Sequence, residues 1–296
     1  MDDRQQRQTL SYFSEMAGDW RAKAEGRVHE VNVITQRNAV VVVEARRRAV
    51  LRRALDVGCG TGELVCELAA MGAEAIGVDF APEMVELSRT KAAAEGATGA
   101  SFVHASIFDY TPEGVFDLIA ANGFIEYISP DQLREFLVKV RVLLAPGGTF
   151  VVGSRNRLFN AFSLNDYTRL EIEAGSLQTL VEEALILADV PGAVEAVDAL
   201  RDRQTVIPPF KEHPSTGIGV ATRHQYVPSE MMRMCADAGL RPARLAGVHF
   251  HGVGAAMAKR RADLHAPLAH LIFEQAAESP QLLPFSSTFM LTAEAV

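Results

Sequence analysis

The sequence predicts an α/β protein with a Rossmann-like, mostly parallel sheet of seven strands, helices on both faces of the sheet and a helical lid insertion. Strand and helix patterns alternate between residues 54 and 153. A strand, a glycine-rich turn and a helix follow one another directly at LDVGCGTGEL, residues 55–64. Helical patterns over 165–212 then interrupt the alternation. Because strands that alternate with helices form βαβ units, we expect a parallel sheet.

Apolar periodicity predicts the individual elements, with short apolar or alternating runs for strands and a period near 3.6 for helices. The chain is expected to be helical within 8–53, including a long apolar-periodic stretch over 31–51. The alternating part comprises strands 54–57, 74–79, 101–104, 116–121 and 148–153, and helices 62–71, 82–95 and 130–144. The remainder comprises helices 168–189, 192–204 and 228–238, a strand at 243–250, a helical stretch at 255–278 and a strand at 286–295.

Composition indicates a globular chain and argues against nucleic acid as a partner. Of 296 residues, 48% are hydrophobic and 22% are charged, and the net charge is -8. We interpret the densest basic cluster as a solvated helix face: Arg46, Arg47, Arg48, Arg52 and Arg53. The longest aliphatic run, AVVVV at 39–43, is too short to span a bilayer, and no signal peptide is recognised. Three cysteines without metal spacing fit a reducing compartment, so we expect a cytoplasmic protein.

The glycine-rich turn predicts a nucleotide-like ligand. Glycines at 58, 60 and 62 allow positive φ and close backbone approach, at a helix N-terminus beside the end of a strand. A dinucleotide fingerprint needs glycine at position 63, where this chain has Glu63, and a carboxylate faces a pyrophosphate badly. Asp56 at the strand end suits a ligand with positive charge nearby, such as S-adenosylmethionine (SAM). DVGCGTG resembles the first motif of class I SAM-dependent methyltransferases.

The resemblance implies SAM as the cofactor and a set of residues that hold it. Asp79, at the tip of the next strand, is expected to accept both ribose hydroxyls, with Phe80 and Met84 beside the adenosine. Ser106 stands where the family has an aspartate that bonds the adenine, which leaves this role to Ser106, the Ile107 backbone N–H or Asp109. The full cofactor-binding prediction is Asp56, Gly58, Cys59, Gly60, Gly62, Asp79, Phe80, Met84, Ser106, Ile107, Asn122 and Gly123.

Three further segments resemble the ubiquinone-biosynthesis O-methyltransferases. Their L-E-H segment corresponds to Ile125, Glu126 and Tyr127 here, so their histidine is missing. SRNRLFN at 154–160 and RHQYVPSEM at 223–231 resemble their segments after the fifth strand and before a later helix. The catalytic prediction is His224 as general base, with Tyr127, Tyr226 and Glu126 positioned around the acceptor.

No metal is expected. His249 and His251 have a spacing on a strand that could bind a metal ion, but no third ligand is evident from the sequence.

We therefore expect a small-molecule methyltransferase that acts on a hydroxyl by in-line displacement, with proximity supplying most of the rate. Alternatives are an N-methyltransferase, a non-catalytic SAM-binding regulator and a nicotinamide oxidoreductase, the last disfavoured by Glu63. The expected partner is a small-molecule acceptor, without nucleic acid or a membrane span, and a homodimer is left open. The expected parts are an N-terminal helical cap (1–53), a SAM-binding core (54–164), a helical lid insertion (165–212) and the C-terminal part of the core sheet (213–296).

Overall fold

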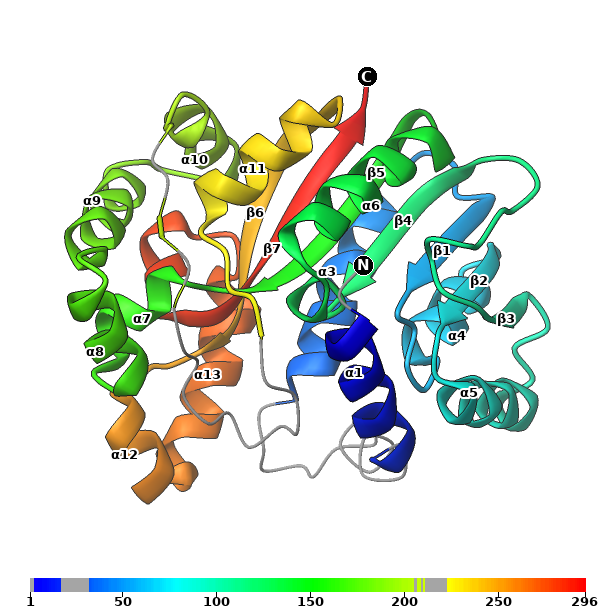
Figure 1. The fold of residues 1–296 in the computed structure, drawn as a ribbon, viewed down its shortest axis with the longest axis horizontal. Coiled ribbons are helices and arrows are strands. Elements are labelled where there is room, and N and C mark those ends of the chain that lie inside the picture. Colours follow the sequence, from blue (N-terminus) through cyan, green and yellow to red (C-terminus); the bar gives the residue numbers. More distant parts are fainter. Residues whose placement is uncertain (1–2, 17–31, 205–206, 209, 211–222) are drawn as a thin grey trace.

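A computed structural model describes residues 3–16, 32–204, 207–208, 210 and 223–296. Its centre is a seven-stranded sheet in the order β3-β2-β1-β4-β5-β7-β6 (Figure 1). The strands are β1 (Arg53–Val57), β2 (Glu74–Asp79), β3 (Ala100–His104), β4 (Phe116–Asn122), β5 (Leu144–Arg155), β6 (Leu240–Phe250) and β7 (Ser286–Ala295). The pairs among β1 to β5 are parallel, whereas β7 runs antiparallel to both β5 and β6. This arrangement confirms the predicted fold class and strand count.

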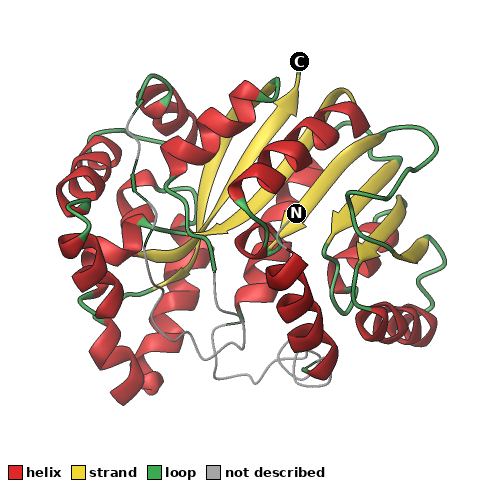
Figure 2. Cartoon of the chain, viewed as in Figure 1, coloured by secondary structure: helices red, strands yellow, loops and turns green. Residues whose placement is uncertain are grey.

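Helices cover both faces of the sheet (Figure 2). In the alternating part they are α4 (Glu63–Ala70), α5 (Pro82–Glu95), the short 3-10 helix η1 (Ile125–Tyr127) and α6 (Pro130–Leu143). Before the sheet lie α1 (Asp3–Glu15) and α3 (Val33–Arg47). After β5 come α7 (Leu158–Ser163), α8 (Asp166–Glu173), α9 (Leu177–Ala188), α10 (Ala193–Leu200), α11 (Pro228–Asp237), α12 (Ala255–Arg260), α13 (Ala262–Ala276) and the 3-10 helix η2 (Pro280–Phe285).

Strand β4 shows how the sequence produces the two layers. Ile119 and Ala121 belong to the core cluster that includes α6 and α11, whereas Leu118 and Ala120 belong to the cluster that includes α3 and α4. Successive side chains of a strand point to opposite faces, and both faces are covered, so the strand is a continuous apolar run. Burying both faces leaves only the strand ends and the loops for polar chemistry.

The helical insertion is observed, but it divides differently from the expectation. The predicted helix 168–189 is interrupted at Gly175, whose φ of +71° ends α8 before α9 begins. Leu180 and Leu187 of α9, and Val197 and Leu200 of α10, belong to the main core cluster. These helices therefore contribute to the core. A lid function for them, like the four-part division of the chain, stays a prediction.

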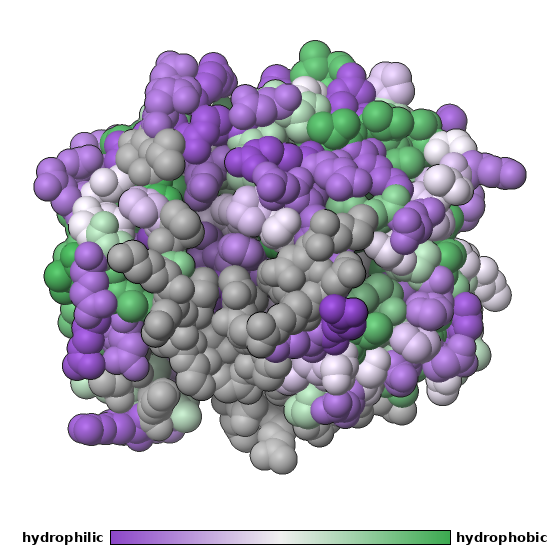
Figure 3. Space-filling view, viewed as in Figure 1, coloured by the Kyte–Doolittle hydropathy of each residue, from purple (hydrophilic) through white to green (hydrophobic). Residues whose placement is uncertain are grey.

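No helix within the described residues is long and apolar enough to cross a membrane. Hydrophilic residues predominate among the coloured atoms on the face drawn in Figure 3, although exposed apolar side chains such as Val142 also occur.

Leu187 and Leu185 of α9 form a matched pair that tests whether the insertion is core. Leu187 is 0% exposed and Leu185 is 60% exposed. We expect Leu187→Ala to lower the free energy of unfolding by about 2–5 kcal/mol, because it removes buried methyl groups and leaves a cavity. Leu185→Ala should change it by less than about 0.5 kcal/mol. Denaturant titration measures both, and equal effects would show that α9 is not part of the core.

Candidate active site

A cavity of about 420 Å³ lies at the carboxyl end of the parallel strands. The loops after β1, β2, β3 and β4 form its walls, and α1 and α3 close it. Its volume falls within the range of about 300–1,000 Å³ that is typical of small-molecule sites. The position is also typical, because the chain order in the sheet reverses between β1 and β4, and loops diverge at such a point.

The glycine loop after β1 opens one wall of this cavity. Gly58 and Gly60 have φ values of +69° and +53°. The backbone N–H of Gly58 donates to the carbonyl of Val78 (2.8 Å), and that of Gly60 donates to the Asp79 carboxylate (3.0 Å). A Cβ added at Gly60 would meet no atom within 4 Å. That space belongs to the cavity, so the glycine keeps it free for a ligand.

Gly62 has a structural role. It has a φ of +84° at the N-cap of α4, and an added Cβ would lie 2.7 Å from Ser88 and 2.8 Å from Phe102. It does not line the cavity, whereas the other eleven predicted cofactor residues do. The glycine is thus required for close packing of the loop against α5 and β3, where no ligand is involved.

Asp79 lies where the sequence placed the ribose acceptor. One carboxylate oxygen accepts from the N–H of Gly60 and the other from the N–H of Ala81 (2.9 Å). Burial raises the pKa of Asp79 to about 6, although these backbone hydrogen bonds act in the opposite direction. The carboxylate is therefore held rigidly at the tip of β2, with lone pairs left for a ligand.

Asp56, near the end of β1, gives the clearest indication that the cavity binds a cationic ligand. It is 4% exposed, and its Oδ1 has no hydrogen-bond partner among the described residues. Burial, together with the charges of Asp79 and Glu63, raises the pKa of Asp56 well above its usual range. A bound ammonium or sulfonium would relieve this repulsion, because opposite charge favours the ionised carboxylate. These acidic residues fit the positive charge of SAM.

Four further predicted cofactor residues line the cavity after β2 and after β3. Phe80 and Met84 line the cavity beside the packed pair Leu10 and Phe13 of α1. Ser106 and Ile107 line it after β3, where the Ser106 hydroxyl accepts from the N–H of Phe108 (3.3 Å). These walls offer apolar surface with one hydroxyl, which suits an adenine ring.

Asn122 and Gly123 line the cavity at the end of β4. Nδ2 of Asn122 donates to Oδ1 of Asn38 (3.2 Å), and its own Oδ1 has no partner among the described residues. Gly123 has a φ of +73°, and an added Cβ would lie 2.3 Å from the guanidinium of Arg37. Glycine at this position lets Arg37 reach across the end of the strand.

Glu126 lies between two arginines on the cavity wall that follows β4. Arg37 from α3 donates to one of its oxygens (3.0 Å), and Arg223, before α11, donates to the other (2.9 Å). Burial alone would raise the pKa of Glu126, but the charges of Arg223, Arg37 and Arg155 outweigh it and lower the pKa. Glu126 is thus an anion that holds two guanidinium groups, and it is unsuited to accept a proton.

Three predicted catalytic side chains have different surroundings from Glu126. Tyr127 lines the cavity, and its ring contacts Phe13 edge-on at 5.2 Å. Burial raises the pKa of Tyr127 to about 12, so it stays protonated and can donate a hydrogen bond. His224 and Tyr226 do not line this cavity. Tyr226 is buried and its backbone bridges to Asn156, so its position is explained by packing. The role of His224 as base stays a prediction.

Several residues that line the cavity were not predicted from the sequence. The cavity is also lined by Gln6, Arg7, Thr9, Leu10, Phe13, Arg37, Asn38 and Arg223. All lie outside the glycine loop and the strand ends, and only the position of Arg223 within RHQYVPSEM could have suggested it. The predicted helical lid would be expected to enclose the acceptor with apolar residues, namely Phe159, Phe162, Leu164, Ile207 and Phe210, and none of these lines this cavity. Ile207 is in the core, and Leu164 is 84% exposed.

A third histidine accompanies His249 and His251, although none was evident from the sequence. His265 of α13 brings its ring beside theirs. In the sequence, His265 is only a histidine within the helical stretch after the strand. Its spacing from His249 and His251 does not predict that the three rings meet.

Comparison with known proteins agrees with the geometry. Residues 54–148 match the family model of a methyltransferase domain. This match to a methyltransferase domain agrees with the glycine loop and the sheet order.

The curated relatives share part of this chain. A ubiquinone biosynthesis O-methyltransferase of Xanthomonas campestris is 35% identical over 114 residues, which are 38% of this chain and 46% of that protein. The enzyme of the same name from Vibrio parahaemolyticus is 29% identical over 155 residues, 52% of this chain and 64% of that protein. The chain thus matches about half the length of these relatives.

Solved structures resemble the whole fold. Magnesium protoporphyrin IX methyltransferase from Synechocystis, with bound S-adenosylhomocysteine (SAH), has a TM-score of 0.56 at 14% identity and covers 99% of this chain and 100% of its own. A 1,6-didemethyltoxoflavin-N1-methyltransferase from Burkholderia thailandensis also has a TM-score of 0.56 at 14% identity, covering 98% of this chain and 88% of its own. These likenesses show a common fold.

A pair of glycine variants tests the open wall. Gly60 and Gly96 have similar φ values, +53° and +64°, and an added Cβ meets nothing within 4 Å at either. Gly60→Ala and Gly96→Ala should each cost about 1–2 kcal/mol in backbone strain. Only Gly60→Ala should weaken SAM binding by calorimetry, because Gly96 ends α5 away from the cavity. Equal SAM affinity in the two variants would contradict the site.

The pKa of Asp79 predicts the pH dependence of SAM binding. A ribose hydroxyl donates to the carboxylate, and protonation removes part of that acceptor capacity. Because the pKa in the free protein is about 6, affinity should fall as the pH drops through 6. Calorimetry between pH 5 and 8 measures this. Asp79→Asn should bind SAM weakly and lose that pH dependence, and an unchanged pH profile in this variant would contradict the assignment.

Proposed function

We propose that the protein transfers a methyl group from SAM to a hydroxyl of a small organic acceptor that carries an anionic group. The observation that supports it most directly is the charge distribution in the cavity. Asp56 and Asp79 line the cavity at the ends of β1 and β2, while Arg37 and Arg223 line it on either side of Glu126, which follows β4. One end suits a cationic methyl donor and the other suits an anionic acceptor.

Bound SAM would supply a methyl group already activated by the sulfonium. The residues then have to hold the acceptor in line and exclude water, which supplies much of the rate in such displacements. Helix α1 contributes to this enclosure, since Phe13 packs on Tyr127. The Tyr127 hydroxyl remains protonated, and its role in the proposal is to donate a hydrogen bond that orients the acceptor.

The arginines also favour a hydroxyl over an amine. Arg155, at the end of β5, acts electrostatically on Glu126 together with Arg37 and Arg223. Three guanidinium charges around one carboxylate leave excess positive charge, which stabilises an anion and repels a protonated amine. The same positive charge lowers the pKa of an acceptor hydroxyl. The hydroxyl therefore loses its proton more readily and depends less on a general base.

The curated relatives support oxygen as the acceptor atom, since their name is that of O-methyltransferases. N-methylation is the second candidate, and the fold admits it, because the Burkholderia neighbour is an N-methyltransferase. A cytoplasmic location and a homodimer stay predictions.

The test is SAH formation from SAM with three matched groups of small aromatic acceptors: hydroxybenzoates, uncharged phenols and anilines. We expect turnover with members of the first group and little with the other two. Turnover confined to anilines would contradict O-methylation, and preference for uncharged phenols would contradict the anionic acceptor.

Arg223→Gln tests the acceptor end separately from the cofactor end. Losing a charge-assisted hydrogen bond of about 1.5–3 kcal/mol should raise KM for an anionic acceptor by about 10- to 100-fold. SAM affinity should stay within about 2-fold, because Arg223 pairs with Glu126 after β4, whereas Asp79 ends β2, and β1 lies between these two strands. Arg241→Gln, at an exposed pair with Glu294, is the matched control. An equal KM in both variants would contradict the role of Arg223.

A further inference from the structure

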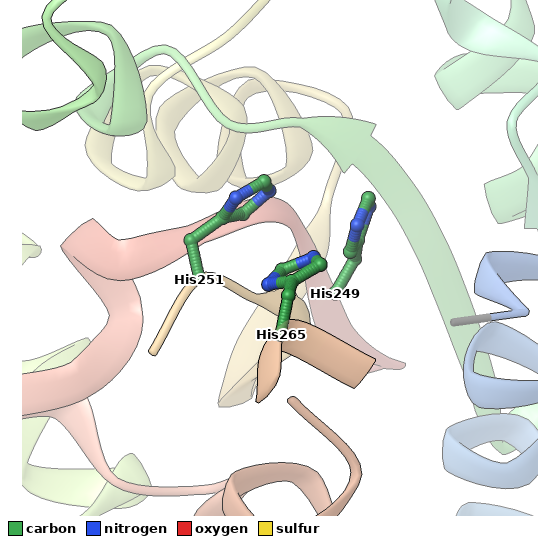
Figure 4. A group of neighbouring side chains, drawn as sticks. All are labelled: His249, His251 and His265. Carbon is green, nitrogen blue, oxygen red and sulfur yellow. The ribbon is translucent and has the colours of Figure 1, made fainter. Parts of the chain in front are cut away.

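Three histidine rings meet beside the last two strands of the sheet. His249 lies near the end of β6, His251 directly follows that strand, and His265 projects from α13 (Figure 4). One nitrogen from each ring lies within 4.8 Å of the other two. The ring centroids are separated by 4.7, 4.9 and 5.9 Å. The fold thus assembles a set of imidazoles that the sequence shows only as a pair.

The ring nitrogens are poorly satisfied within the protein. Both nitrogens of His251 and Nδ1 of His265 are buried atoms without a hydrogen-bond partner among the described residues. Leaving a buried polar atom without a partner costs about 1–3 kcal/mol. A neutral imidazole has one lone pair, so His251 and His265 can each offer one to an occupant of this place.

His249 is held in the manner of a metal ligand. Its Nδ1 lies 3.0 Å from the hydroxyl of Ser287 on β7, which leaves Nε2 for another partner. Histidines that ligate metal ions usually bond through one nitrogen and are oriented by a hydrogen bond at the other. Its backbone has a φ of +53°, a costly conformation for a residue with a side chain, and Gln36 accepts its N–H at 2.7 Å. The strain turns the His249 ring out of the regular strand pattern.

The rings are also in the protonation state that coordination requires. Burial lowers the pKa of His249 to about 3 and that of His251 to about 4, and burial lowers the pKa of His265 as well. Neutral imidazoles have a lone pair to offer at neutral pH.

We propose that His249, His251 and His265 form a binding site for one divalent transition-metal ion, with Zn²⁺ as the best match. Imidazole nitrogens suit zinc, copper, iron and nickel, whereas magnesium and calcium prefer oxygen. Bonds of about 2.0–2.1 Å in tetrahedral geometry place ligand atoms about 3.3 Å apart. The nitrogens therefore close in by about 1.5 Å at most on binding, and side-chain rotation supplies this movement.

Three protein ligands leave one coordination position open, which is the arrangement of reactive rather than purely structural zinc sites. The site lies close to the acceptor end of the cavity. Gln36 precedes Arg37 on α3, and Ser287 precedes Thr288, whose hydroxyl accepts from Arg37 at 3.3 Å. Arg37 and Arg155 contribute to the lowered pKa of His249, so their charge opposes a cation, and the carboxylate of Glu126 partly offsets it.

The competing explanation is an aromatic stack without metal. Phe159 of α7 packs on His251 with ring centroids 4.5 Å apart, so the rings have an apolar neighbour. Packing explains the ring contacts, but it leaves the ring nitrogens of His251 and His265 without partners. The two explanations differ in whether a metal ion binds.

The experiment is titration of the metal-stripped full-length chain with Zn²⁺, followed by calorimetry and by elemental analysis after desalting. About one equivalent should bind. His265→Ala should weaken Zn²⁺ binding by about 100-fold or more, and Ser287→Ala by about 10-fold, because the first removes a ligand and the second its orienting partner. His270→Ala, on the same helix and outside the cluster, is the matched control and should leave the affinity unchanged.

Thermal unfolding and circular dichroism of each variant show that it is folded, and Co²⁺ loading gives an independent readout. Intense visible d–d absorption of the Co²⁺ form, lost in His265→Ala and kept in His270→Ala, supports the site. Absence of Zn²⁺ binding in the original chain, or equal affinity in the His265 and His270 variants, overturns the proposal. Binding of Mg²⁺ in preference to Zn²⁺ would also overturn it.

Discussion

The ion pairs of Glu126 with Arg37 and Arg223 connect parts of the chain that are far apart in sequence. Arg37 comes from α3 before the sheet, Glu126 follows β4, and Arg223 precedes α11. A buried ion pair adds little net stability, because desolvation offsets much of the attraction. Its value here is positional: the carboxylate fixes two guanidinium groups at one end of the cavity. The acceptor end of the site depends on this interaction.

The parallel sheet places that arginine pair opposite a cluster of acids. Asp56 and Asp79 end two neighbouring strands, and parallel strands bring their carboxyl ends to one edge. Buried charges of one sign are costly without partners. Asp56 shows that cost in its raised pKa and its unpartnered oxygen. The acids suit a cationic methyl donor, and the arginines suit the anionic acceptor that we propose.

The sequence predicted the sheet and the cofactor wall, because both depend on local patterns. Strands β1 and β4 follow from short apolar runs, and the turn follows from Gly58 and Gly60. Each of these patterns spans only a few residues. The acceptor end depends on long-range contacts: Arg37 and Glu126 are 89 positions apart, and no periodicity connects them. His265 was missed for the same reason. Gly62 was assigned to the ligand because its motif position carries no information about the packing of Ser88 and Phe102.

The most direct test of the account is native mass spectrometry of the freshly purified protein, before and after addition of SAM. The account predicts a non-covalent complex with the mass of SAM or SAH, either carried through purification or formed on addition. It also predicts that Asp79→Asn shows much less of that complex. A bound nicotinamide dinucleotide, or no complex with SAM in the folded protein, would contradict the central claim that this cavity binds a cationic methyl donor.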